Sequence, residues 1–313
     1  MAISIGSAVG AGFSLIGRRP LSVIGWGFFL YFAIMILFVI GFLIVGLPVF
    51  GKLSQLSSQT PDPSQMAEVV VQVLIMLWPA LLIVAIGALL LGAVVQGAVY
   101  RSILTPDQRS WASLRLGRQE FALVLLSLLL IPIVLIAYLV SALIGGAVIY
   151  GLSRLQGAVG PILVTVFVIF YALALMWLAL KFSLAAPMTF AEGRVRFFGS
   201  WSLTKGHGWA LFGLAWIMVL VIIGVSIAYA IISSIIGALF TGGAVAAIMS
   251  STSGANPDPS ALMAQWPVLL LAYLPTLIMG AAFQGVTQAI SLGPWVEVYR
   301  ELRGSPDVAQ TFT

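Results

Sequence analysis

Residues 18–52 read RRPLSVIGWGFFLYFAIMILFVIGFLIVGLPVFGK, and no charged side chain stands between Arg19 and Lys52. A helix of about 20 apolar residues crosses the roughly 30 Å of hydrocarbon in a bilayer, so this run is long enough to span a membrane. Further apolar runs of similar length follow it. The six predicted spans are residues 21–49, 71–99, 121–150, 158–181, 209–240 and 266–293.

The composition of the chain excludes a soluble globular fold. Hydrophobic residues make up 61% and charged residues 7% of the 313 residues, whereas a soluble chain of this length needs a far larger polar surface. We therefore expect an all-α integral membrane protein that forms a single membrane domain over residues 1–313. Its six transmembrane helices are expected to form three helical hairpins, with amphipathic interfacial helices on the cytoplasmic side.

The basic residues predict the orientation of the spans. Twelve of the 14 lysines and arginines fall on one side of the six runs, and the other side has only Lys52 and Arg154. Cytoplasmic loops of membrane proteins carry an excess of Lys and Arg, so both termini are expected in the cytoplasm. The net charge of +5 follows from this loop bias. It is not the clustered basic face of a nucleic-acid-binding domain, so we expect no nucleic-acid partner.

Short sequence matches indicate an internal repeat of two-span units. Residues 92–97 read GAVVQG and residues 280–285 read GAAFQG, and a Tyr-Arg pair follows each match, at residues 100–101 and 299–300. The predicted repeats are residues 1–104, 105–191 and 192–313. Two-span units share one orientation, so an axis along the membrane normal would relate them.

Four segments on the basic side mix aromatic and basic side chains in patterns typical of amphipathic helices at a membrane surface. They lie at the N-terminus, between spans two and three, between spans four and five, and after Pro294. These side chains suit contact with anionic lipid headgroups, and they suit equally the simple anchoring of loops to the interface. The candidate headgroup-binding residues are Arg109, Arg115, Arg118, Arg194, Arg196, Lys205, Trp111 and Trp201.

The predicted spans carry few polar side chains. Gln284, Thr287 and Gln288 are spaced three and four residues apart on one face of span six, and Gln96 is the repeat counterpart of Gln284. This stripe would line a water-filled cavity, or its members would hydrogen-bond across helix contacts worth about 0.6 to 2 kcal/mol each. No charged residue lies near the centre of any span, which disfavours a proton-coupled carrier.

The sequence contains no recognisable catalytic constellation. Cysteine is absent and His207 is the only histidine, so neither a thiolate nucleophile nor a multi-histidine metal site can form. Asp107 and Glu192 are isolated acids in basic loops, where we expect them to pair with neighbouring arginines. We therefore expect no enzymatic activity, no metal site and no cofactor.

Three features carry a resemblance to a bacterial membrane family. They are the related segments that enter spans one, three and five, GSWSLTKG at residues 199–206, and WVEVYRELR at residues 295–303. Over nearly its whole length the chain is similar to the membrane domain attached to some glycerophosphoryl diester phosphodiesterases, and to stand-alone six-span relatives. The resemblance implies a bacterial inner-membrane protein that handles or organises phospholipid. The catalytic barrel of the fused enzymes has no counterpart here, so no hydrolytic activity is implied.

The leading functional hypothesis is a non-enzymatic inner-membrane protein. Its basic and aromatic collar on the cytoplasmic side would engage anionic phospholipid or a membrane partner, either another protein or a second copy of the chain. The alternative is a transporter or channel for an apolar or amphipathic solute that uses the polar stripe of span six.

Overall fold

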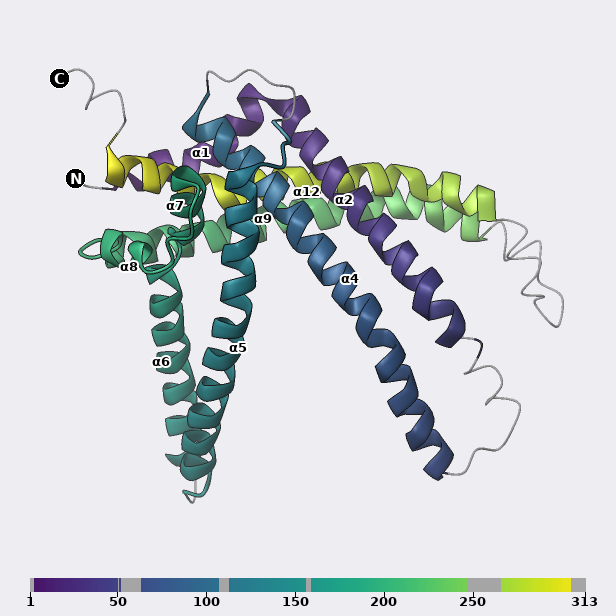
Figure 1. The fold of residues 1–313 in the computed structure, drawn as a ribbon, viewed down its shortest axis with the longest axis horizontal. Coiled ribbons are helices and arrows are strands. Elements are labelled where there is room, and N and C mark those ends of the chain that lie inside the picture. Colours follow the sequence, from purple (N-terminus) through teal and green to yellow (C-terminus); the bar gives the residue numbers. More distant parts are fainter. Residues whose placement is uncertain are drawn as a thin grey trace. The chain divides into compact units, whose positions relative to one another are not determined.

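The computed structural model describes residues 3–49, 51, 63–106, 113–155, 159–246 and 266–304. Over these residues every regular element is a helix, which confirms the predicted all-α fold. Within these described ranges, six helical stretches are long and apolar enough to cross a membrane, and they match the six predicted spans. The protein is therefore a multi-pass helical membrane protein (Figure 1).

The helices, in chain order, are α1 (Ile5–Arg18), α2 (Pro20–Gly41), η1 (Phe42–Gly46), α4 (Pro63–Leu104), α5 (Arg118–Ser153), α6 (Val159–Lys181), α7 (Ala185–Glu192), α8 (Gly199–Leu203), α9 (Gly208–Gly237), η2 (Ala238–Gly242) and α12 (Trp266–Arg303). Two compact units divide the chain. Unit 1 contains Met1–Leu15, Gln96–Val219 and Ile290–Thr313, and unit 2 contains Ile16–Val95 and Leu220–Ala289.

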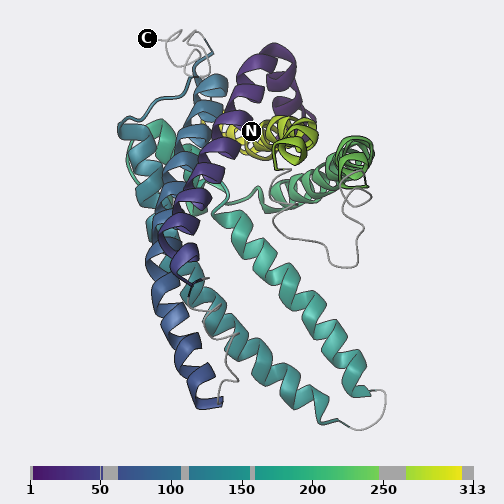
Figure 2. The same cartoon turned by 90° about the vertical axis from the view of Figure 1, so that its right-hand side faces the viewer.

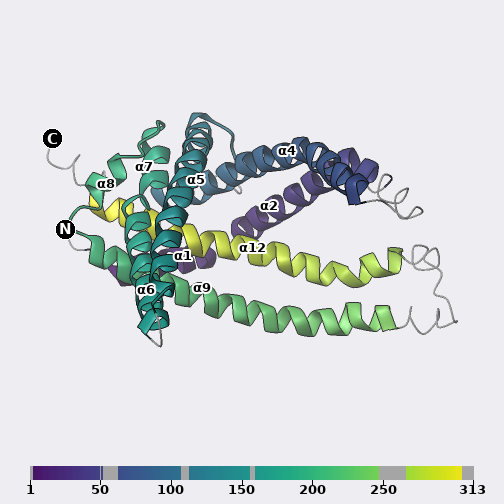
Figure 3. The ribbon, with the colours of Figure 1, turned by 90° about the horizontal axis from the view of Figure 1, so that it is seen from below.

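Unit 2 is held together where its helices meet closely. Gly27 of α2 and Gly285 of α12 face each other, since a Cβ built on Gly285 would lie 3.0 Å from the backbone nitrogen of Gly27. A Cβ built on Gly27 would collide with the backbone carbonyl of Ala281. Beyond this crossing α9 and α12 run side by side (Figure 3), and Tyr229 stacks on Phe283 with ring centroids 3.9 Å apart. Because lipid supplies no hydrophobic force between helices, such close backbone contact stabilises the unit through packing.

The first part of α4 packs against α2 and η1 within the same unit. A Cβ on Gly41 would lie 3.4 Å from the Val84 side chain, at ordinary van der Waals distance. Val45, Val49 and Ala80 form a small apolar cluster at the far end of this pair. Small side chains along the contact therefore let the two helices lie close together.

In unit 1, α5 and α6 lie side by side (Figure 2). The Tyr171 hydroxyl of α6 donates a hydrogen bond of 2.7 Å to the backbone carbonyl of Ser141 in α5. Toward the other end of α5, Leu126 packs against Ala185, the first residue of α7, and against Phe197 in the loop that follows α7. These contacts fix α7 beside the beginning of α5.

The N-terminal helix α1 packs against the last part of α12, also in unit 1. A Cβ on Gly293 would lie 2.8 Å from the backbone nitrogen of Gly12. The Glu301 carboxylate accepts hydrogen bonds from the Ser4 backbone N–H at 3.0 Å and from the Ser7 hydroxyl at 2.5 Å. A carboxylate at the start of a helix satisfies free N–H groups and complements the helix dipole. The beginning of the chain and the end of α12 therefore lie together.

The predicted interfacial segments differ in their structures. α1 forms the expected N-terminal helix, but the residues after Pro294 form no separate helix, because α12 continues to Arg303. Val296, Val298 and Tyr299 are buried in unit 1, and their packing outweighs the roughly 3 kcal/mol that a proline costs inside a helix. The connection between α4 and α5 is not helical over residues 113–117, and residues 107–112 lie outside the described part. The hairpin topology, the interfacial placement and the repeat remain predictions.

The crossing of α2 and α12 yields a test with a matched control in the same helix. Gly27→Ala should lower the free energy of unfolding by about 1–3 kcal/mol, because the added methyl group forces the two backbones apart. Gly25→Ala should leave stability unchanged or slightly higher, since a Cβ on Gly25 meets nothing within 4 Å and alanine favours a helix over glycine. Unfolding followed by tryptophan fluorescence in detergent measures both variants. Equal stability of the two variants would contradict the crossing.

Candidate functional site

The first turn of α5 carries Glu120, whose carboxylate caps the start of that helix. Gly117 precedes the helix with an extended backbone, and Glu120 stands at the third helical position. One oxygen of Glu120 accepts a hydrogen bond of 2.9 Å from the Gly117 N–H. This is the glutamate half of a capping box, which satisfies one of the free N–H groups at a helix start.

The other oxygen of Glu120 forms an ion pair with Arg101, near the end of α4. Both side chains are buried, at 10% exposed for Arg101 and 2% for Glu120. Arg101 also donates to the backbone carbonyl of Ser113, whose φ of 50° places it in the left-handed region. A buried guanidinium and a buried carboxylate each lose hydration, so such a pair persists only where further hydrogen bonds complete it.

Two neighbours make room for this ion pair and complete its surroundings. Gly97, one turn before Arg101, has no side chain, and a Cβ there would lie 2.7 Å from the Glu120 carboxylate. The Phe190 ring of α7 lies 5.6 Å from the Arg101 guanidinium and makes an edge contact with Tyr100 at 5.5 Å. The ring face attracts the cation, an interaction that strengthens when both groups are desolvated. Three helices thus hold Arg101 in place.

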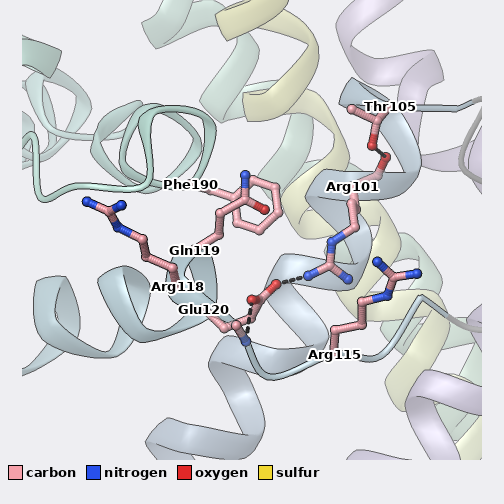
Figure 4. Close-up of a pocket in the computed structure, with 8 residues that line it drawn as sticks. Arg101, Thr105, Arg115, Arg118, Gln119, Glu120 and Phe190 are labelled. Carbon is pink, nitrogen blue, oxygen red and sulfur yellow. Dashed lines mark hydrogen bonds and ion pairs between the residues drawn. The ribbon is translucent and has the colours of Figure 1, made fainter.

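A pocket of about 320 Å³ opens beside the ion pair, and we name it the Glu120 pocket. Its lining residues are Arg101, Thr105, Arg115, Gly117, Arg118, Gln119, Glu120 and Phe190. Arg115 and Arg118 are exposed, whereas Arg101 is buried. Figure 4 shows Arg115 beside the Arg101 guanidinium and Arg118 on the other side of Glu120. Of these three arginines, Arg101 alone pairs with Glu120, and the guanidinium of Arg118 points away from the carboxylate in Figure 4. Because three arginines and one carboxylate line the pocket, the lining has an excess of positive charge.

A second group of arginines surrounds Glu192 at the end of α7, and we name it the Glu192 cluster. Gly193 adopts a φ of 64° and ends the helix, which turns the chain so that the next residues return toward Glu192. Glu192 accepts from Arg194 at 3.2 Å and Arg196 at 2.7 Å, and its other oxygen binds Arg303 of α12 at 3.0 Å. The predicted pairing of Glu192 with neighbouring arginines is confirmed. Arg303, which is distant in sequence, is a further partner.

Aromatic rings lie close to the Glu192 cluster in sequence and form a stack of their own. Phe182 and Phe197 are parallel with ring centroids 4.4 Å apart, and Trp201 of α8 lies 5.6 Å from Phe182. Trp201 is 45% exposed, and Lys205 is exposed just after α8. The Ser200 hydroxyl of α8 donates a hydrogen bond of 2.8 Å to the Lys181 backbone carbonyl, which fixes α8 to the end of α6.

The structure divides the predicted headgroup-binding residues between these two groups. Arg115 and Arg118 line the Glu120 pocket, and Arg194 and Arg196 belong to the Glu192 cluster. Trp201 and Lys205 stand on or after α8, and Arg109 and Trp111 lie outside the described residues. Sequence reasoning missed Arg101, Glu120, Phe190 and Arg303. Arg101 carried a signal because it belongs to the repeated Tyr-Arg pair, and Arg303 carried one because it ends the segment WVEVYRELR.

The polar stripe of the predicted spans is split between the two compact units. Gln284, Thr287 and Gln288 are half-buried in the unit 2 part of α12, whereas Gln96 is half-buried in unit 1. The Thr287 hydroxyl oxygen is buried and has no hydrogen-bond partner among the described residues. Both interpretations of the stripe, the water-filled cavity and the hydrogen bonding between helices, remain predictions.

Comparisons with known proteins assign no family to the chain: no family model, curated protein or solved structure matches it. Within the described ranges, no group of three or more His, Asp or Glu residues is placed to hold a metal ion. The chemistry that the two arginine groups offer is the binding of anions. Arginine presents five N–H donors in a planar fork that matches carboxylate and phosphate oxygens.

Removing one partner of the buried ion pair should be far more damaging than replacing both. Glu120→Ala leaves the Arg101 guanidinium buried without a counter-charge, so the free energy of unfolding should fall by about 3–5 kcal/mol. The double variant Arg101→Met/Glu120→Met removes both charges and keeps similar volume, so it should lose less. Chemical unfolding in detergent measures both variants. A double variant as unstable as Glu120→Ala would show that the ion pair does not organise this region.

Proposed function

We propose that this protein is a non-enzymatic protein of the bacterial inner membrane that binds anionic phospholipid through a basic and aromatic collar. The collar consists of the Glu120 pocket and the Glu192 cluster, together with Lys205 and Trp201 and the two predicted members outside the described residues, Arg109 and Trp111. Lipid headgroups carry phosphate, and arginine is the side chain best suited to bind phosphate through two hydrogen bonds at once.

One observation carries the proposal: in each group three arginines accompany a single carboxylate, all three paired with Glu192 in the Glu192 cluster and all three lining the pocket beside Glu120 in the Glu120 pocket. In the Glu192 cluster, the side chains of Arg194, Arg196 and Arg303 remain 65%, 42% and 50% exposed after pairing with Glu192. One carboxylate has about four acceptor sites, whereas three guanidinium groups have about fifteen donors. Most donors therefore face outward and are available to an anion.

The charge distribution supports the proposed orientation. Nearly all basic residues precede or follow the spans on the side that carries the chain termini, and the positive-inside rule assigns this side to the cytoplasm. A basic segment near an anionic leaflet is attracted by roughly 1 kcal/mol per Lys or Arg. The resemblance to the membrane domain of glycerophosphoryl diester phosphodiesterases, which we keep as a proposal, points in the same direction.

Native mass spectrometry of the gently extracted protein tests the proposal. Wild-type protein should retain anionic phospholipid in preference to zwitterionic phospholipid. The variant with Arg109, Arg115, Arg118, Arg194 and Arg196 replaced by Gln should lose retention by at least about tenfold, because each removed charge costs on the order of 1 kcal/mol at the membrane surface.

The matched control removes basic residues from the other side of the spans. Lys52→Gln/Arg154→Gln should retain anionic lipid as the wild type does, since these two residues lie opposite the collar in the predicted topology. Undiminished retention in the arginine variant would refute the collar. A retained non-lipid solute in place of lipid would favour the transporter alternative.

A further inference from the structure

The Glu120 pocket differs from the Glu192 cluster in one respect that bears on ligand choice. Its central arginine, Arg101, is buried, and its guanidinium is held by Glu120, by the Ser113 carbonyl and by the Phe190 ring. Charges in a desolvated setting interact more strongly than charges in water. A group fixed before binding also loses less conformational freedom when the ligand arrives. This pocket therefore has one fixed guanidinium beside which the exposed Arg115 and Arg118 can act on an anion, whereas all three arginines of the Glu192 cluster are exposed.

The charge of the pocket indicates which anion it fits. Arg101, Arg115 and Arg118 carry three positive charges, and Glu120 carries one negative charge, which leaves an excess of two. A phosphodiester headgroup carries one negative charge. A phosphomonoester has a second pKa of about 6, so it carries nearly two negative charges at neutral pH. Only the monoester neutralises the lining.

The carboxylate of Glu120 lies where it does not strongly repel an anion bound in the pocket. Its carboxylate is 2% exposed, with one oxygen on the Gly117 N–H and the other on Arg101 against Gly97. The negative charge is thus enclosed by its partners. Arg115 lies beside Arg101, and Arg118 lies on the other side of Glu120 with its guanidinium turned away (Figure 4). Both side chains are exposed, so each can turn toward a phosphate at the open side of the pocket.

From these observations we propose that the Glu120 pocket selects a phosphomonoester dianion. The group would come from a lipid with a terminal phosphate or from a soluble phosphate ester. A volume of about 320 Å³ is at the small end of ligand sites, which suits a headgroup rather than a whole lipid. The inference rests on the proposed function, because it assigns a preferred headgroup to the collar.

The test compares phosphatidate with phosphatidylglycerol, each titrated in nanodiscs of otherwise zwitterionic lipid against the full-length protein. At about pH 7.5, where the monoester is dianionic, phosphatidate should bind at least about fivefold more tightly. At about pH 5 the monoester carries a single charge, so the preference should disappear. The phosphatidylglycerol arm at both pH values corrects for titration of the protein. The charged groups that line the pocket are Arg101 from α4, Arg115 from the connection before α5, and Arg118 and the enclosed Glu120 from the first turn of α5. The helix α7 contributes Phe190.

Two double variants, each of which removes two positive charges, show which arginines produce the preference for phosphatidate. Arg115→Gln/Arg118→Gln should bring the affinity for phosphatidate down to that for phosphatidylglycerol. Arg194→Gln/Arg196→Gln should weaken the binding of both lipids by the same factor and keep the preference. All four residues are exposed, so both variants should fold, which circular dichroism and size-exclusion chromatography verify. A preference that survives loss of Arg115 and Arg118 would overturn the proposal.

Soluble glycerol 3-phosphate separates the two sources of the phosphate. Displacement of phosphatidate by this ester would identify the phosphate group alone as the ligand, and phosphatidate binding without displacement would identify the lipid headgroup. Equal binding of the two lipids by the wild type would overturn the phosphomonoester inference and leave the proposed function standing. Absence of binding to either lipid would refute both.

Discussion

The ion pair between Arg101 and Glu120 is the interaction on which the geometry of unit 1 at this point depends. It joins the end of α4 to the start of α5, across a connection that has no helical structure over residues 113–117. Burying both charges is costly, and each neighbour reduces that cost in a distinct way. Gly97 leaves space for the carboxylate, and the Gly117 N–H and Ser113 carbonyl supply its hydrogen bonds and those of Arg101. The pocket is the open side of this arrangement.

Glycines at matching sequence positions allow close approach in both units. Gly97 and Gly285 end the matched segments GAVVQG and GAAFQG. In unit 1 Gly97 admits the Glu120 side chain at the start of α5, and in unit 2 Gly285 admits the backbone of α2 near its start. Each glycine therefore clears space for the beginning of another apolar helix. Sequence analysis could find the match, but not this physical reason for it.

The fold was largely predictable because the constraint that shapes it acts locally. A span needs a certain length of apolar residues, and that length is visible in the sequence without tertiary contacts. The end of α12 was not predictable in this way, since Pro294 reads as a helix end and only the burial of Val296 and Val298 keeps the helix intact. The site was half predictable. The mixture of basic and aromatic side chains between spans two and three indicated Arg115 and Arg118. The contact of Phe190 with Arg101 was not predictable, because it brings together residues far apart in the chain and depends on packing.

The two arginine groups contain similar sets of charges but differ in the burial of their arginines. The arginines around Glu192 are exposed although Glu192 itself is only 10% exposed, so one of them can turn to a passing headgroup while the other two keep the carboxylate paired. Arg101 cannot leave Glu120 without stranding a buried charge, so it stays in place whether or not a ligand is present. Under the proposed function, the exposed cluster raises the local concentration of anionic lipid. The buried Arg101–Glu120 pair then holds one guanidinium in a fixed position, and Arg115 and Arg118 beside it favour one type of phosphate group over another.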